Sequence, residues 1–497
     1  MERLKIGARW SSAQILINVS VRIGTLAVLA RLLTPSEFGL FAAAVTVIEF
    51  ARPLSTLSMD HAIVQSKTLG RGSAALASWL ALGLSACVAA FIGLEARLVR
   101  LLYDDPGVPR VLASLALSLP LGAAASLLMA SLRRRLAFRE LSILVVVSTV
   151  LSSLASVVAA FAGLGIWALV VGYYTDLALR GCFAWMLARP RLQRPHLGQD
   201  VRGLLRFGVG SALSLSLNFW ALQGDYVVVG SALGPKPLGL YSRAYQLIST
   251  VPGMLNQLHQ MVLFPAFSRA QSDRAYLERA LRVGTEATAA LTLPLSAWGV
   301  VLGPQIISVL LGPGWEQAVL PFQILSLGLY FRSAYSLSAS IVFATGHVFW
   351  LSACQAAYGI LVVGGALFAA RWGIPGVAVA VLGALFIFYV FLYALAARIS
   401  GAPASSFWRV HVRPMGVLGI VFATALLSHF AFAHLEASAL VEVIITVLLG
   451  VMFLAAATWL LGERLWGPLL YTRGFAALGR ATSSAPALTE EEDGADE

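Results

Sequence analysis

The sequence predicts an all-α integral membrane protein with about fourteen transmembrane helices. Of its 497 residues, 59% are hydrophobic and only 12% are charged, and the mean hydropathy is +0.81. A soluble chain is about half apolar and about a quarter charged. The apolar residues stand in runs of about 20, the length that crosses a bilayer as a helix. The period-two alternation of barrel strands is missing from the sequence, so the spans are expected to be helices.

Apolar runs define the expected spans in chain order. The first half holds runs near residues 12–33, 39–60, 74–94, 110–131, 141–162 and 164–187. The second half holds runs near 206–233, 239–263, 284–311, 319–344, 350–370 and 374–397. Two further runs follow, near 413–432 and 439–461.

These runs predict the domain organisation. We expect a six-helix bundle over 1–187, a cytoplasmic linker over 188–205 and a second six-helix bundle over 206–400. Two additional transmembrane helices occupy 401–465, and 466–497 form a cytoplasmic tail. The tail ends in a run of acidic residues, a composition typical of disorder.

The basic residues indicate topology rather than nucleic-acid binding. The net charge is +11, and most Lys and Arg residues stand in short clusters between the apolar runs. Alternate connections hold about four times as many basic residues as the others, as the positive-inside rule requires. We therefore expect a multi-pass protein of the inner (cytoplasmic) membrane, with both termini cytoplasmic.

Two stretches of the chain share a pattern at an offset of 200 residues. Residues 33–41 read Leu-Thr-Pro-Ser-Glu-Phe-Gly-Leu-Phe, and residues 233–241 read Leu-Gly-Pro-Lys-Pro-Leu-Gly-Leu-Tyr. Each lies between two predicted spans, where Pro starts a helix and Gly permits a tight turn. Because six spans separate the copies, both halves have the same orientation. This predicts a parallel repeat of two bundles that face each other across a cavity.

Several ionisable residues fall inside the predicted spans. Such residues are costly in lipid, and they usually face a cavity or a partner. The candidates are Arg22, Glu49, Arg52, Asp225, Arg243 and Arg332, with Asp60 at the end of the second span. Glu49 and Arg52 share a helix face, so an internal salt bridge is one interpretation. Asp225 and Arg243 lie in adjacent spans and allow a similar pairing.

The surplus of arginine favours an anionic ligand, because the planar guanidinium matches phosphate oxygens. We expect Arg22, Arg52, Arg243 and Arg332 to line a cationic cavity that takes a pyrophosphate headgroup while its lipid tail stays in the bilayer. Glu49, Asp60 and Asp225 are candidates for coupling or gating. The sequence shows no nucleophile–base pair and no metal-ligand spacing, so we expect neither catalytic residues nor a metal site.

Several motifs carry a family resemblance. They are Trp10-Ser-Ser-Ala-Gln, 31–41, Ala62-Ile-Val-Gln65, 218–225, 230–246, 263–269 and Leu311-Gly-Pro-Gly-Trp315. Together they resemble the Wzx-type polysaccharide flippases, the lipopolysaccharide and exopolysaccharide branch of the multidrug/oligosaccharidyl-lipid/polysaccharide exporter superfamily. The resemblance covers residues 5–400. One departure is Met59-Asp60-His61, where the family usually has Gly-Leu, so this end of the second span is more polar than expected.

The resemblance implies that the protein moves an undecaprenyl-pyrophosphate-linked oligosaccharide from the cytoplasmic to the outer leaflet. It implies alternating access of two bundles, driven by a coupling proton or sodium ion or by the membrane potential, and no other cofactor. The implied partners are this substrate, membrane lipid and the polysaccharide polymerase or export machinery. Asp225 and Arg243 fall on the family's second-half motif.

Other functions remain open on the sequence alone. A MATE-like, ion-coupled exporter of small organic cations is the main alternative, although an acidic cavity would suit it better than surplus arginine. A membrane enzyme such as a glycan polymerase usually needs a large external loop, and the predicted connections are short. A structural role in the lipid is the remaining alternative.

Overall fold

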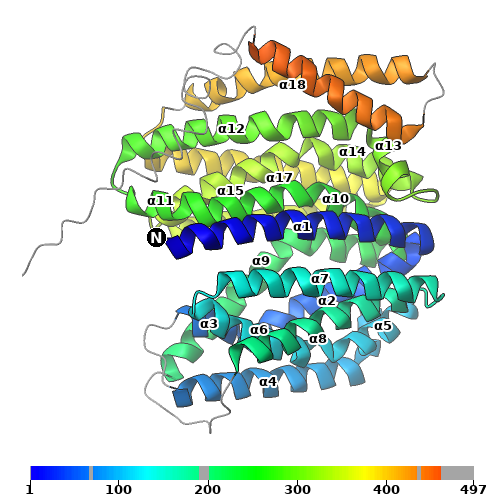
Figure 1. Cartoon of the computed structure of the whole chain (residues 1–497), viewed down its shortest axis with the longest axis vertical. Helices are drawn as coiled ribbons and strands as arrows, with labels where there is room; N and C mark the ends of the chain where they lie inside the picture. Colours follow the sequence, from blue (N-terminus) through cyan, green and yellow to red (C-terminus); the bar gives the residue numbers. More distant parts are fainter. Residues whose placement is uncertain (1, 66–70, 190–200, 404, 434–437, 460–497) are drawn as a thin grey trace, which may run out of the picture.

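The computed structural model describes residues 2–65, 71–189, 201–403, 405–433 and 438–459. Within these ranges all regular elements are helical, which confirms the predicted all-α class. The helices run side by side along one direction, and Figure 1 shows them in two groups with α1 between them. The predicted acidic tail and most of the predicted linker lie outside the described residues.

The first group contains the helices up to residue 188. It consists of α1 (Glu2–Leu32), α2 (Pro35–Thr56), α3 (Met59–Gln65), α4 (Arg71–Leu94), η1 (Ala96–Leu101), α5 (Gly107–Ala116), α6 (Ser118–Arg134), α7 (Phe138–Phe161) and α8 (Trp167–Ala188). Helix α7 packs against α1 on one side and α8 on the other, and α6 packs between α4 and α8. This arrangement places α1 and α8 on either side of α7.

The second group contains the helices from residue 201 onward. It consists of α9 (Val201–Leu233), α10 (Pro235–Leu258), η2 (His259–Leu263), α11 (Phe264–Arg269), α12 (Arg274–Val301), α13 (Gly303–Leu310), η3 (Glu316–Ala318), α14 (Val319–Leu327), α15 (Leu329–Ala344), α16 (Val348–Ala369), η4 (Ala370–Trp372), α17 (Gly373–Ser400) and α18 (Ser405–Ala433), followed by a helix over Ala439–Trp459. Helix α9 already begins at Val201, so it takes in the end of the predicted linker.

Several predicted spans are broken helices. The run 39–60 divides because Leu57 and Ser58 adopt left-handed φ angles of 48° and 46°, so Asp60 belongs to the separate helix α3. The run 284–311 bends by 83° between α12 and α13, where Pro304 has no amide hydrogen to continue the helix. The runs 110–131 and 319–344 each contain two helices that meet end to end.

The number of membrane crossings stays a prediction. In the described part of the chain, eight helical segments are long and apolar enough to cross a membrane, or nine if the bent pair α12 and α13 is one span. One of these segments, 348–400, takes in both α16 and α17. Each of the predicted apolar runs is nevertheless helical over most of its length.

The two repeated stretches meet where α2 crosses α10. Thr34 caps α2, because its hydroxyl accepts from the Glu37 amide while the Glu37 carboxylate accepts from the Thr34 amide. In the second copy Gly234, with φ of 92°, precedes Pro235 at the start of α10. We call the end of the molecule that carries these two helix starts the crossing end.

Gly39 and Gly239 lie within the helices and not in the turns, so the predicted turn role is wrong for both. A Cβ atom on Gly39 would lie 1.7 Å from the Pro235 carbonyl oxygen, and one on Gly239 would lie 1.8 Å from that of Pro35. Only glycine permits two helix backbones to approach this closely. The repeat therefore encodes a reciprocal crossing of the two groups.

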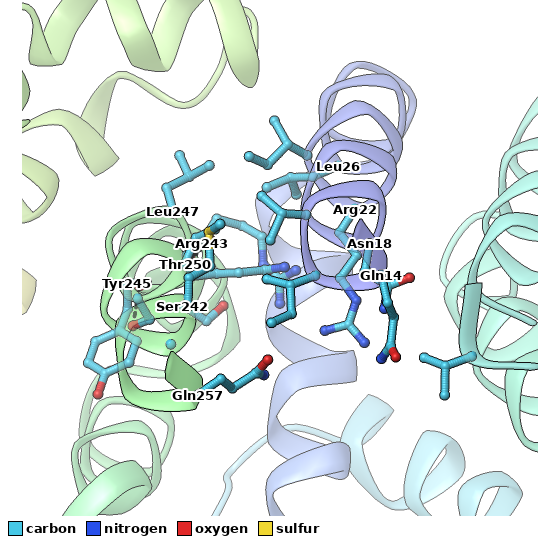
Figure 2. A pocket seen from close by; sticks show the side chains of 18 of the residues that line it. Gln14, Asn18, Arg22, Leu26, Ser242, Arg243, Tyr245, Leu247, Thr250 and Gln257 are labelled. Atoms are coloured by element: carbon cyan, nitrogen blue, oxygen red, sulfur yellow. Dashed lines mark hydrogen bonds between the residues drawn. The ribbon is translucent and has the colours of Figure 1, made fainter. Parts of the chain in front are cut away.

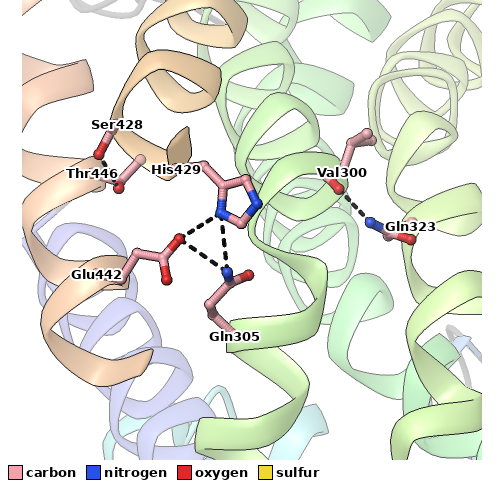
Figure 3. Close-up of polar contacts among 7 residues, drawn as sticks. All are labelled: Val300, Gln305, Gln323, Ser428, His429, Glu442 and Thr446. Atoms are coloured by element: carbon pink, nitrogen blue, oxygen red, sulfur yellow. Dashed lines mark hydrogen bonds and ion pairs between the residues drawn. The ribbon is translucent and has the colours of Figure 1, made fainter. Parts of the chain in front are cut away.

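The last two helices attach to the second group near α13. Glu442 accepts a hydrogen bond from Gln305 at 2.9 Å and pairs with the His429 ring at 2.7 Å (Figure 3). Ser428 and Thr446 join the same two helices at 2.5 Å. These contacts fix α18 and the helix Ala439–Trp459 on the outside of the second group.

Candidate functional site

A cavity of about 560 Å³ lies between α1 of the first group and α10 of the second. Helix α1 contributes Gln14, Asn18, Arg22 and Leu26, which repeat every four residues and so share one face. Figure 2 shows these side chains together with those that α10 contributes to the cavity. Helix α10 lines the opposite side from Ser242 to Gln257, again at helical spacing.

Three arginines line the cavity. Arg22 comes from α1, Arg180 from α8 and Arg243 from α10. Arg243 reaches from α10 toward α1 (Figure 2), and its guanidinium lies 4.9 Å from the centre of the Phe38 ring. No carboxylate is among the described residues that line the cavity. The described lining therefore carries positive charge, and it contains two of the four arginines that the sequence analysis expects there, Arg22 and Arg243.

Arg180 has a carboxylate beside it on its own helix. Its Nε atom lies 2.9 Å from Oδ2 of Asp176, four residues earlier on α8. Such a pair fixes the direction of the arginine side chain and leaves its other nitrogen atoms to bind a ligand. The cavity wall and its immediate support thus carry three cations and one anion.

The polar remainder of the lining consists of amides and hydroxyls. Gln14 and Asn18 face Gln246, Ser249, Thr250 and Gln257 across the cavity. Amide side chains both donate and accept hydrogen bonds, so they match hydroxyl-rich ligands. The lining therefore combines a phosphate-binding group of arginines with a wall suited to sugar hydroxyls.

The predicted pair of Glu49 and Arg52 forms a salt bridge, with Oε1 and Nη2 2.8 Å apart. Arg52 also donates to the Tyr173 hydroxyl at 2.5 Å. Neither residue is among those that line the cavity. In the structure, Glu49 and Arg52 therefore form an internal salt bridge and do not line the cavity.

Arg332 lies one side chain behind the cavity wall. It donates a hydrogen bond to the Tyr245 hydroxyl, and its guanidinium lies 4.4 Å from the centre of that ring. Tyr245 itself is a lining residue whose ring turns to the side of α10 away from α1 (Figure 2). Arg332 therefore acts on the cavity through Tyr245 and not by direct contact.

The predicted pairing of Asp225 with Arg243 is wrong. Asp225 is 1% exposed and accepts a hydrogen bond from the Tyr241 hydroxyl at 2.7 Å, whereas Arg243 turns to Phe38. Tyr241, and not Arg243, is the residue of α10 that contacts the Asp225 carboxyl group. Asp60 on α3 is also apart from the cavity lining, with the His61 ring 3.9 Å away.

Further contacts join the first group to the second at the crossing end. The Trp315 indole, fully buried, donates to the Ala30 carbonyl at 3.0 Å and meets the Phe38 ring edge-on at 5.4 Å. Arg31 donates to the Val309 carbonyl at 2.6 Å. These contacts tie α1 to the α13–η3 segment, and the α2–α10 crossing lies beside them.

Asp176 and Arg180 are site residues that the sequence analysis missed. Both lie inside the predicted span 164–187, so the search for charges at membrane depth could have found them. Gln14, Asn18 and Gln257 carry no comparable signal, because neutral polar side chains at helical spacing occur on many buried helix faces.

Comparison with known proteins places the chain in a family. The profile of the family described as "Polysaccharide biosynthesis protein" matches residues 28–320, more than half of the sequence. The chain belongs to this family. The matched region contains Arg180, Arg243, Asp225 and both glycines of the helix crossing.

Two relatives of this polysaccharide biosynthesis protein are informative. The succinoglycan biosynthesis transport protein ExoT of Rhizobium meliloti (strain 1021) is 27% identical over 322 residues, 64% of this chain and 65% of ExoT. The chain thus matches just under two thirds of that relative's length. The lipopolysaccharide biosynthesis protein WzxC of Escherichia coli (strain K12) is 23% identical over 351 residues, 70% of this chain and 71% of WzxC.

Solved structures share the fold of this polysaccharide biosynthesis protein. The lipid II flippase MurJ, in an inward closed conformation, matches with a TM-score of 0.70 and 12% identity over 91% of this chain and 99% of that chain. A multidrug resistance MATE family transporter, in an inward-facing conformation, matches with a TM-score of 0.57 and 16% identity over 80% and 95%. The protein is therefore a multi-pass membrane protein with a fold known from transporters.

Proposed function

We propose that this polysaccharide biosynthesis protein moves a lipid-linked oligosaccharide, carried on undecaprenyl pyrophosphate, from the inner to the outer leaflet of the cytoplasmic membrane. The observation that carries the proposal is the cavity in which Arg22, Arg180 and Arg243 converge from three helices of two groups. The naming of ExoT as a transport protein and of MurJ as a flippase supports the same function. The proposal is transport and not catalysis.

The arginines suit a pyrophosphate. A hydrogen bond between a guanidinium and a charged oxygen is worth about 1.5–3 kcal/mol, so three of them offset much of the cost of taking the phosphates out of water. The amide wall from Gln14 to Gln257 would take the first sugars. The lipid tail stays in the bilayer, because each CH₂ moved from lipid to water would cost about 0.8 kcal/mol.

Alternating access would follow from the position of the contacts between the two groups. By the positive-inside rule the crossing end faces the outside. In this orientation the α2–α10 crossing and the Trp315–Ala30 contact close the outer side of the cavity. Separation of the two groups at the crossing end would release the headgroup outward. The exported repeat unit would then pass to a polymerase or export machinery.

A MATE-like exporter of organic cations is the second candidate. The shared fold favours it, but a cavity lined by three arginines repels cations. The two candidates therefore differ in the sign of the charge that the cavity accepts.

Deletion of the gene in the native host, followed by analysis of membrane lipids and surface glycan, tests the proposal. We expect lipid-linked repeat units to accumulate on the cytoplasmic face, and the wild-type gene to reverse this. The triple variant Arg22→Gln, Arg180→Gln, Arg243→Gln should fail to reverse it. The matched control Arg97→Gln, Arg100→Gln, Arg110→Gln removes three exposed arginines away from the cavity and should reverse it fully. Unchanged surface glycan with altered dye efflux would instead indicate the cation exporter.

A further inference from the structure

We propose that Asp176 is an internal counterion that holds Arg180 in place and lowers the affinity of the cavity for the pyrophosphate headgroup, so that the headgroup can leave. The inference rests on the proposed function and adds the step of release. The Oδ2 atom of Asp176 lies 2.9 Å from Nε of Arg180. Arg180 lines the cavity, whereas Asp176 is not among the lining residues. Asp176 is therefore a positioning residue that acts on the ligand through Arg180.

The ion pair lies near the middle of a membrane helix. Asp176 and Arg180 are the tenth and fourteenth residues of α8, so they lie about 14 and 20 Å along the axis from its start at Trp167. Their side chains are largely buried, with 27% of Asp176 and 22% of Arg180 exposed. A carboxylate at this depth is costly in lipid and usually has a cation to neutralise. Asp176 thus supplies a negative charge beside the cationic lining.

A second arginine shares this carboxylate. Arg22 of α1 lies close enough to Arg180 and Asp176 to interact with both charges. Among the described residues, no carboxylate lies within ion-pair distance of Arg22. Without Asp176 the like charges of Arg22 and Arg180 would repel each other across the empty cavity. Asp176 therefore stabilises the empty cavity, which is the state that follows release of the headgroup.

The carboxylate of Asp176 keeps part of its negative charge free. Its second oxygen, Oδ1, is buried and accepts no hydrogen bond from a described residue. A phosphate that binds the remaining nitrogen atoms of Arg180 comes within a few ångströms of this carboxylate, and like charges at such a distance repel. The cavity therefore binds phosphate less tightly than the same arginines would without Asp176.

Weaker binding serves transport, because a ligand must be able to leave its site as well as enter it. Arginines around a pyrophosphate form charge-assisted hydrogen bonds, the strong kind, and all of them break when the headgroup leaves. An arginine without an anion at membrane depth is unstable. Asp176 remains beside Arg180 after the headgroup has left, so this cation keeps a partner throughout the cycle. The headgroup and Asp176 thus compete for the same cation.

Titration calorimetry of the full-length protein in lipid nanodiscs, with undecaprenyl pyrophosphate as the ligand, tests the counterion. Asp176→Asn keeps an oxygen atom for Arg180 and removes only the charge. We expect about tenfold tighter binding, because the repulsion between carboxylate and phosphate is lost. The control Glu442→Gln removes a carboxylate that pairs with His429 away from the cavity, and it should bind as the wild type does. Unchanged or weaker binding by Asp176→Asn overturns the proposal, because Asp176 would then only support the fold around Arg180.

A charge-balanced double variant keeps the test decisive where Asp176→Asn alone does not fold. Asp176→Asn combined with Arg180→Gln leaves neither a carboxylate nor a guanidinium of this pair in the membrane. It should bind undecaprenyl pyrophosphate more tightly than Arg180→Gln alone, in which the unpaired carboxylate repels the phosphate. Equal or weaker binding by the double variant contradicts the counterion.

Vesicles that carry the protein and a labelled undecaprenyl-pyrophosphate oligosaccharide test the role in release. Asp176→Asn should lower both the KM and the maximal rate of translocation, since the headgroup binds more tightly and leaves more slowly. A purely structural defect would raise the KM or leave it unchanged, and either result overturns the role in release while the proposed transport stands. A wild type that neither binds nor moves the lipid overturns the proposed transport and the counterion together.

Discussion

Gly39 of α2 and Gly239 of α10 each lie against the backbone at the start of the other's helix. Cβ atoms at these positions would come within 1.7 Å of the Pro235 oxygen and 1.8 Å of the Pro35 oxygen. The contact is reciprocal, because each glycine lies four residues after the proline that the other glycine contacts. The two groups therefore meet at their own repeated residues, and the closeness of that contact depends on two missing side chains.

Gly39→Ala and Gly239→Ala are expected to force the crossing end apart. In a helix interior alanine is favoured over glycine by about 0.5–1 kcal/mol, but overpacking costs about 1–3 kcal/mol and the clash is with rigid backbone. Ser242→Cys, in a background without the native cysteines, reports access to the cavity through its labelling by a membrane-impermeant thiol reagent. Labelling from the crossing end should rise severalfold in either glycine variant.

Gly24→Ala provides the control for this experiment, because a Cβ atom there meets nothing within 4 Å. It should leave labelling unchanged and raise the unfolding temperature slightly. Equal labelling in Gly24→Ala and Gly39→Ala would show that the crossing does not control access.

Trp315→Phe is expected to loosen the second contact at the crossing end. Phenylalanine keeps an aromatic ring against Phe38 but loses the indole donor to the Ala30 carbonyl. A net hydrogen bond is worth about 1 kcal/mol, which corresponds to about a fivefold larger open population. Labelling of Ser242→Cys measures this change. Trp372→Phe, which changes an exposed tryptophan at the end of η4, should have no effect.

Hydrophobic runs in the sequence predict the helices, because backbone polar groups in lipid must be paired within a helix. Of the four arginines expected to line a cavity, Arg22 and Arg243 do so, whereas Arg52 and Arg332 do not.

The sequence does not predict where the helices break, since Leu57, Ser58 and Leu302 lie inside apolar runs. The sequence also does not show which charged side chain bonds to which partner. Asp225 takes Tyr241 and not Arg243 because the α10 helix turns Tyr241 inward toward α9, a fact of packing that spacing along the chain does not contain.

The repeat illustrates the same limit. Its pattern predicts two like-oriented halves, but the sequence suggests that Gly39 and Gly239 serve turns. In the structure Thr34 and Gly234 stand at the turns before α2 and α10. Gly39 and Gly239 instead form the contact between these two helices, which are 200 residues apart in the sequence. Such a role can be recognised only when both helices are placed.

Arg22→Gln and Arg180→Gln are each expected to weaken the binding of undecaprenyl pyrophosphate in nanodiscs by about ten- to a hundredfold. This range corresponds to the loss of about 1.5–3 kcal/mol for a hydrogen bond to a charged oxygen. The loss of binding free energy in the double variant should be smaller than the sum of the two single losses, since both side chains bind one ligand. Titration calorimetry measures the three affinities. Arg97→Gln, an exposed arginine of η1, should bind as the wild type does, and an equal loss there would point to general surface charge.

Glu442→Ala is expected to loosen the last two helices without changing the cavity. The substitution leaves the half-buried side chains of His429 and Gln305 without their shared acceptor, and a net hydrogen bond is worth about 0.5–1.5 kcal/mol. The unfolding temperature should fall, whereas undecaprenyl pyrophosphate should bind with unchanged affinity, because the described lining includes no residue of α18 or of the helix Ala439–Trp459. Glu442→Gln keeps an acceptor for Gln305, so its unfolding temperature should fall less. A loss of affinity in Glu442→Ala at a temperature where the protein stays folded would mean that these helices shape the binding site after all.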